Sequence, residues 1–247
     1  MKKTFIFLLY LNVLFGIWGN QILTDEYGKI KITIPSSDLI QEKYGNPNKI
    51  YVTINTVLAS DIKDKEMGAY SSLFWDIYSK NNYIYDKDKI IEAINLNDFN
   101  KTGKFIISDT DSIDYLKSSY EKVVYKDNVI GESSTYISFM DTGYNEKYNL
   151  MMEYELDVVL DDRIITITVG LVHFPWEEII KQYPQWFILH DNNEYFWKNI
   201  HCLEEFYSMF KDGDNAQFPE IVKLFGQIKN MILDSIQIKD EINTNRN

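Results

Sequence analysis

Two long runs of β-type residues meet at a pair of aspartates in the second half of the chain, and this pattern constrains the fold most. Residues 148–160 lead to Asp161 and Asp162, and residues 163–172 run back. A short polar pair between two such runs is a common connection between antiparallel neighbours. Residues 134–140 alternate in the same way. The segment predicts an antiparallel sheet. A parallel nucleotide-binding sheet is not expected, because the sequence has no Gly-rich strand-to-helix turn.

Shorter strands are predicted before and within this region. Residues 27–35 read YGKIKITIP, with isoleucine at alternate positions and a terminating proline, and residues 50–54 alternate again. Such period-two runs are typical of half-buried strands, and we expect these two to pair as a hairpin. Further strands are predicted at 105–107 and at 123–125, the latter leading into a turn at Lys126, Asp127 and Asn128.

Apolar residues at spacings of three and four predict helices between and after the strands. The predicted helices span 61–80, 86–96, 109–120, 175–183 and 193–210. A last helix carries an apolar stripe of Ile221, Leu224, Phe225, Ile228 and Ile232, and a short strand at 235–239 follows it. Residues 97–104 read as a loop, and the tail from about residue 240 is polar. The fold class is therefore α+β, with a mainly antiparallel sheet flanked by helices in a single domain over 21–247.

Residues 1–20 differ from the rest of the chain and predict a signal peptide. Lys2 and Lys3 precede an apolar run that ends at Trp18, and no acidic residue occurs before Asp25. This charge and length pattern is that of an export signal, with cleavage expected after Gly19. An uncleaved membrane anchor and a buried N-terminal element are the alternatives. The run is short for a bilayer span, and no later stretch is apolar enough for one.

The composition argues against a nucleic-acid partner and against stabilisation by disulfide bonds. With 25 basic and 37 acidic residues the net charge is -12, which argues against nucleic acid as a partner. Cys202 is the only cysteine, so no internal disulfide is expected, and a buried inert thiol is the simplest interpretation.

We predict no catalytic residues, no metal site and no cofactor. His190 with Glu194, and His201 with Glu205, have an i, i+4 spacing, but neither pair belongs to a His-Glu-x-x-His motif. Residues 108–114 resemble a calcium loop but lack its central glycine and closing glutamate. No Gly-x-Ser-x-Gly nucleophile motif is present.

An aromatic-rich segment at 174–210 supplies the candidate ligand-binding residues, which are Trp176, Tyr183, Trp186 and Phe187. Such rings could line a groove for a sugar, a peptide or an apolar ligand. The alternative, which we favour, is that they fill the core beneath two helices. Trp186 follows Pro184 in a predicted loop and is expected to be exposed, whereas Trp197, in the predicted helix 193–210, is expected to be structural.

Three segments resemble the Mog1/PsbP-like group, which includes small exported bacterial domains. They are YGKIKITIP at 27–35, the antiparallel run at 134–172, and the amphipathic helix that leads into DSIQIK at 234–239. The tryptophan often found soon after the proline in that group is replaced here by Ser36-Ser37-Asp38-Leu39. The resemblance implies an α/β/α sandwich, a closing strand beside the opening one, and a binding or assembly role.

The expected function is that of an exported, soluble binding or envelope-assembly module without catalytic activity. Its partner would be a protein or small molecule of the cell envelope, in the periplasm or outside the cell, and the mature chain would not insert stably into the membrane. The alternative is an extracytoplasmic hydrolase with an acidic active site.

Export with cleavage near Gly19 is directly testable. N-terminal sequencing of the protein from its host should find a mature end close to Asn20, because the preceding residues have the charge and length of an export signal. A cytoplasmic protein that retains Met1 would contradict the prediction.

Overall fold

The structure is a computed structural model, and it describes residues 19–42, 45–46, 48–60, 85–96, 116–140, 149–171, 173, 175–189, 195–198, 201–202, 205 and 217–239. Several predicted features lie outside these residues. They are positions 1–18 of the signal peptide, the helix 61–80, the loop 97–104, the strand 105–107, the cluster 108–114 and the tail from 240.

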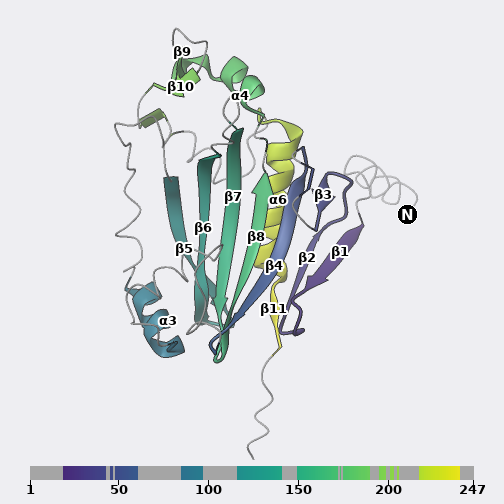
Figure 1. The fold of residues 1–247 in the computed structure, drawn as a ribbon, viewed down its shortest axis with the longest axis vertical. Helices are drawn as coiled ribbons and strands as arrows, with labels where there is room; N and C mark the ends of the chain where they lie inside the picture. The colour runs from purple at the N-terminus through teal and green to yellow at the C-terminus, as the bar shows by residue number, and fades with distance from the viewer. Residues whose placement is uncertain are drawn as a thin grey trace, which may run out of the picture.

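A six-stranded sheet forms the centre of the described molecule (Figure 1). Its strand order is β3-β4-β8-β7-β6-β5, and all neighbours are antiparallel except β3 and β4. The strands are β3 (Ile40–Gln41), β4 (Ile50–Leu58), β5 (Leu116–Tyr125), β6 (Asn128–Met140), β7 (Asn149–Val159) and β8 (Arg163–Leu171). The predicted antiparallel region is therefore confirmed, and it makes up four adjacent strands.

Both predicted turns in this region are confirmed as tight hairpins. Lys126 and Asp127, between β5 and β6, have φ of 48° and 65°, the left-handed values that suit a two-residue turn between twisted strands. Between β7 and β8 the Leu160 N–H donates to the Arg163 carbonyl at 2.9 Å. That bond closes the loop around the two aspartates.

A second, three-stranded sheet has β2 (Ile30–Pro35) between β1 (Asn20–Thr24) and β11 (Gln237–Ile238). The Asp25 carboxylate closes the β1–β2 turn, accepting from the N–H groups of Ile30 and Tyr27 at 2.6 and 3.1 Å. The placement of the closing strand beside the opening one agrees with the sequence resemblance.

The predicted pairing of strands 27–35 and 50–54 is wrong. β2 pairs with β1 and β11, whereas β4 pairs with β3 and β8 in the other sheet. β8 gives β4 a nine-residue ladder, which is longer than β2 could offer. β1, at the junction with the predicted signal peptide, was not expected as a strand and takes the place beside β2.

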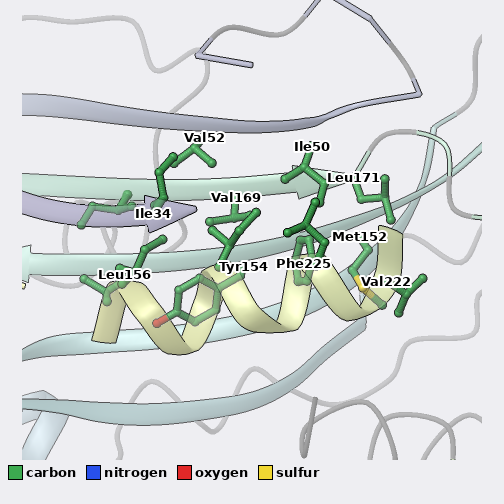
Figure 2. Packing of buried hydrophobic residues seen from close by; sticks show 14 of the residues in the cluster. Ile34, Ile50, Val52, Met152, Tyr154, Leu156, Val169, Leu171, Val222 and Phe225 are labelled. Carbon is green, nitrogen blue, oxygen red and sulfur yellow. The ribbon is translucent and has the colours of Figure 1, made fainter. Parts of the chain in front are cut away.

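Helix α6 (Glu220–Ser235) forms the main core with both sheets, as its predicted stripe requires. Leu224, Phe225, Ile228 and Ile232 are buried, and β2 contributes Ile30, Ile32 and Ile34 to the same cluster. Figure 2 shows the helix lying across the strands that carry Tyr154, Leu156 and Val169. Each such side chain stabilises the fold by roughly 1.5–3 kcal/mol when fully buried.

Helix α3 (Lys87–Asn95) covers one end of the opposite face of the six-stranded sheet. Its Ile90 and Ile94 pack on Val159 and Ile164. Because neighbouring strand residues point to opposite faces, these two lie across the sheet from Val158 and Ile165 in the main core. Helices thus flank both faces, in agreement with the expected α+β class. None of the described helices is long and apolar enough to span a bilayer.

Two predicted helices are wrong over part of their length. Residues 116–120, within the predicted helix 109–120, belong to β5, where β6 supplies a partner ladder that local spacing could not reveal. Residues 195–197, within the predicted helix 193–210, form β10 (Tyr195–Trp197), antiparallel to β9 (Phe187–Leu189). Three consecutive aromatic residues favour a strand. The helix predicted at 175–183 is confirmed as α4 (Trp176–Gln182).

The β7–β8 turn is tied to two neighbouring segments. The Tyr85 hydroxyl, just before α3, lies against the carbonyls of Leu160 and Arg163, the latter at 2.8 Å. The Ala59 N–H, just after β4, donates to the Asp162 carbonyl at 2.8 Å. Burial is the main cause that raises the pKa of Tyr85, so this phenol stays a neutral donor.

Arg163 links the same turn to the other sheet. Its Nε and Nη2 donate to the two Asp162 carboxylate oxygens at 2.7 and 2.5 Å. Its guanidinium carbon lies 4.6 Å from the centroid of the Tyr27 ring in the β1–β2 turn. The hydrogen bond from Arg163 is the main cause that lowers the pKa of Asp162.

We expect Asp162→Asn to lower the free energy of unfolding at pH 7 by about 0.5–1 kcal/mol, a magnitude discounted for the exposure of this carboxylate. A lowered folded-state pKa contributes stability above the ordinary carboxyl pKa of about 3.9, and this stability is lost as pH falls through the folded-state value. Denaturant melts of the two proteins should therefore differ at pH 7 and converge at about pH 2. Asp127→Asn, at the other hairpin, is the control and should change little. A difference that persists in acid would contradict the assignment.

Candidate functional site

Three of the four predicted ligand-binding residues come together beyond one end of the six-stranded sheet, where α4, the short helix η3 (Pro184–Trp186) and β9 lie (Figure 1). The Tyr183 and Trp186 rings are stacked, with centroids 4.2 Å apart and planes 7° apart. Phe187 follows directly and is buried. Trp176 is the first residue of α4, and its side chain is outside the described part of the structure.

Local backbone geometry and two hydrogen bonds hold these rings. Pro184 starts the η3 turn, and the Trp186 N–H donates to the Tyr183 carbonyl at 3.1 Å, which folds the indole back onto the phenol. The indole Nε1 donates to Glu205 at 3.1 Å, and the Tyr183 hydroxyl donates to Gln217 at 3.1 Å.

The expectation that Trp186 is exposed is wrong, because only 2% of its surface is accessible. The proline begins a turn of helix instead of an open loop. Tyr183, Trp186 and Phe187 belong to the same cluster as Phe218 and Val222 from the α6 region. The core alternative therefore holds for these three rings. A ligand-binding role for the segment stays a prediction. Trp197 lies in β10, and its side chain is outside the described part of the structure.

Four carboxylates gather on the face of the six-stranded sheet opposite α6, and sequence reasoning did not single them out. Glu153, Glu155 and Asp157 alternate along β7 with the core residues Tyr154 and Leu156. Glu132 of β6 is the register partner of Asp157. All four side chains are buried, with 3–8% of their surface accessible. The available signal was the alternation of acidic and apolar residues at 153–157.

Neighbouring strands supply donors to this acidic face. The Tyr51 hydroxyl of β4 donates to Glu153, and Thr166 Oγ1 of β8 donates to Asp157 at 2.6 Å. Tyr51 crosses β8 over Gly170, where an added Cβ would lie 2.1 Å from the ring. None of the four carboxylates is without a partner. These donors replace the hydrogen bonds to water that the carboxylates lose on burial.

Buried carboxylates can act as general acids or bases, or bind cations, when water or substrate reaches them. Among the described residues, no group of three or more histidine, cysteine or acidic side chains is arranged to hold a metal. Glu205, which has an i, i+4 spacing to His201, accepts the hydrogen bond from the Trp186 indole. His190 and Glu194 lie outside the described residues.

The outer edges of the two larger sheets differ in how they are protected. β3 and β11 are two residues long. β5 is long, but it contains two register shifts and the charged residues Lys117, Glu121 and Lys122. Shortness, irregularity and charge are the usual devices that prevent further strands from pairing. β1, with the sequence NQILT, has five residues in unbroken register and contains neither charge nor proline.

Among the described strands, β1 has a hydrogen-bonded partner on one side only, which is β2. Gly19 and Asp25 make hydrogen bonds to Ser36 and Ile30 across the β1–β2 ladder. Because antiparallel bonding alternates, the N–H and C=O groups of Asn20, Ile22 and Thr24 point away from β2. These three residues are exposed, Ile22 to 56%. In Figure 1 β1 lies at one of the two edges of its sheet.

Comparisons with known proteins give no family assignment, since no family model matches the chain. Over 188 residues it is 28% identical to a protein described as probable polyketide synthase 30 of Dictyostelium discoideum. The match covers 74% of this chain but only 5% of that protein, so the chain spans a small fraction of its length.

Solved structures match the fold at low similarity. Mog1p of Saccharomyces cerevisiae, titled a Ran-binding protein, aligns with a TM-score of 0.40 and 10% identity, covering 90% of this chain and 97% of that one. A Mog1 mutant gives the same values. The matches agree with the resemblance noted from the sequence, and at these values they carry no argument about function.

Trp186→Ala should lower the free energy of unfolding by about 3–5 kcal/mol, because lost transfer energy and a cavity add up in the core. Ile188→Ala is the matched control two residues away. Ile188 is 43% exposed, so its truncation should cost less than about 1 kcal/mol. Urea melts followed by circular dichroism measure both. Equal losses for the two variants would contradict the core assignment of the indole.

Proposed function

We propose that this chain is an exported, non-catalytic module that binds a protein of the cell envelope. The observation that carries the proposal is the edge of β1 that no described strand covers, where Asn20, Ile22 and Thr24 are exposed and direct their backbone groups outward. Strand addition to an open edge is a recurrent mode of protein recognition, in which main-chain hydrogen bonds supply affinity.

The expected export is compatible with this use of β1. Cleavage after Gly19 would leave all five residues of the strand, Asn20–Thr24, in the mature protein. The net charge of -12 supports a protein partner over nucleic acid.

The alternative hydrolase would use the acidic face, since that is where carboxylates converge. Two observations weigh against it. Glu153 and Asp157 are already engaged by Tyr51 and Thr166. All four carboxylates are nearly enclosed, whereas a hydrolase must admit both substrate and water.

One experiment separates the two functions. The tagged, exported protein and its Glu155→Gln variant are cross-linked in the envelope of the host, and captured proteins are quantified by mass spectrometry. The same two samples are assayed against peptide, ester and glycoside substrates. We expect one envelope protein to be captured equally by both and no hydrolysis by either. Hydrolysis that Glu155→Gln abolishes would overturn the proposal in favour of the alternative.

A further inference from the structure

We infer that the partner supplies an extended, uncharged segment flanked by lysine or arginine, which adds to β1 as a further strand of the three-stranded sheet. This inference rests on the proposed protein-binding function and deepens it. Three features of β1 and its surroundings define the chemistry of the partner segment: the backbone, the side chains and the nearby charges.

The backbone of β1 sets the extended conformation of the occupant. Asn20, Ile22 and Thr24 present donors and acceptors at the spacing of a strand, and the register with β2 is unbroken from Asn20 to Thr24. The strand is held on its other side by the five-residue ladder to β2, so it is ordered before any partner arrives. A pre-ordered edge reduces the conformational cost of binding.

The side chains of β1 select an uncharged central run. Ile22 stands on the outer face of the sheet, beside its register partner Thr33. Leu23 points to the opposite face and packs against the core. An added strand would place its residues beside these two, and alternating apolar and hydroxyl side chains suit both. A charge opposite Ile22 would gain no partner there.

Charges at the two ends of β1 select basic flanks. Glu26 is exposed just beyond Thr24, and the exposed Glu42 accepts a hydrogen bond from Gln21 at 2.8 Å. Lys31, the register partner of Thr24, is also exposed, and it disfavours a cation directly beside it. The whole chain carries a net charge of -12. Complementary charge is therefore expected outside the paired run and not within it.

A second copy of the chain is the less favourable occupant. Two copies would bring together chains of net charge -12 each. A pairing of two five-residue strands also buries well under the roughly 1,000 Å² typical of a stable interface. A basic segment of another protein avoids this charge repulsion, and it can make further contacts beyond the strand.

The test uses the mature full chain and a synthetic nine-residue peptide of alternating valine and threonine, with two lysines at each end. A second peptide carries glutamates in place of the lysines. Affinity is measured by calorimetry, and backbone amide protection is measured by NMR at Ile22 and Thr24, because Asn20 is the amino-terminal residue of a chain cleaved after Gly19 and has no amide. We expect the lysine peptide to bind at least tenfold more tightly than the glutamate peptide and to protect these two amides, and we expect its binding to weaken as salt is raised.

Two variants locate the binding. Ile22→Lys places a charge on the edge, and Val124→Lys places the same charge on β5 at a residue of similar exposure, 58% against 56%. We expect Ile22→Lys to weaken binding at least tenfold and Val124→Lys to leave it nearly unchanged. Both residues are exposed, so both variants should fold, which amide spectra will verify.

Each contrary result overturns a defined part of the inference. Equal affinity for the two peptides would refute the basic flanks. Equal weakening by the two variants, or no amide protection, would refute the β1 site, even where the envelope experiment captures a protein and the binding function stands. Sedimentation that shows a dimer, abolished by Ile22→Lys, would identify a second copy as the occupant.

Discussion

The burial of α6 between β2 and the six-stranded sheet is the contact on which the rest of the structure depends. β2 comes from the start of the described chain and α6 from its end, and neither sheet pairs directly with the other. The isoleucines of β2 and the stripe of α6 share one cluster with the core face of β7 and β8. With a single cysteine, no disulfide can replace this contact. Apolar burial is therefore the main contribution that joins these two ends of the described chain to the six-stranded sheet.

Polar contacts around the β7–β8 turn fix the relative positions of the elements that the apolar core brings together. Arg163 meets Tyr27 of the small sheet, Tyr85 meets the carbonyls of the turn, and Lys87 pairs with Asp161 at 2.6 Å. Each contact is weak beside the core, since exposed ion pairs contribute little. Together they connect a β1–β2 turn, a β4 end and a helix start to one hairpin, so that sheet register and helix position are set at the same place.

Sequence periodicity was sufficient where a segment's own pattern decided its structure. The hairpins at Lys126-Asp127 and Asp161-Asp162, the helices α3, α4 and α6, and the final strand all follow from local alternation or helical spacing. It failed where a distant partner decided. β4 pairs with β8, which is far away in the sequence, and not with the nearby β2, and residues 116–120 form a strand because β6 lies beside them.

The candidate sites also depend on contacts that no local sequence pattern contains. The aromatic residues were visible in the sequence, but whether Trp186 faced solvent depended on the direction in which one short turn folded. The acidic face was hidden for another reason. Glu132 and Asp157 are 25 positions apart, and they become neighbours only through the β6–β7 register. No local pattern contains that register.

The charge distribution of the chain explains how an edge strand that no described strand covers can be kept in an acidic protein. An uncharged edge invites pairing with any extended chain, including another copy. A large net charge opposes the approach of like molecules at long range, and it favours a cationic segment in the same step. β1 itself must then stay neutral, because a lysine there would block strand pairing while a glutamate would repel backbone carbonyls at close range. The uncharged sequence NQILT, within a chain of net charge -12, meets both conditions of the proposed binding edge.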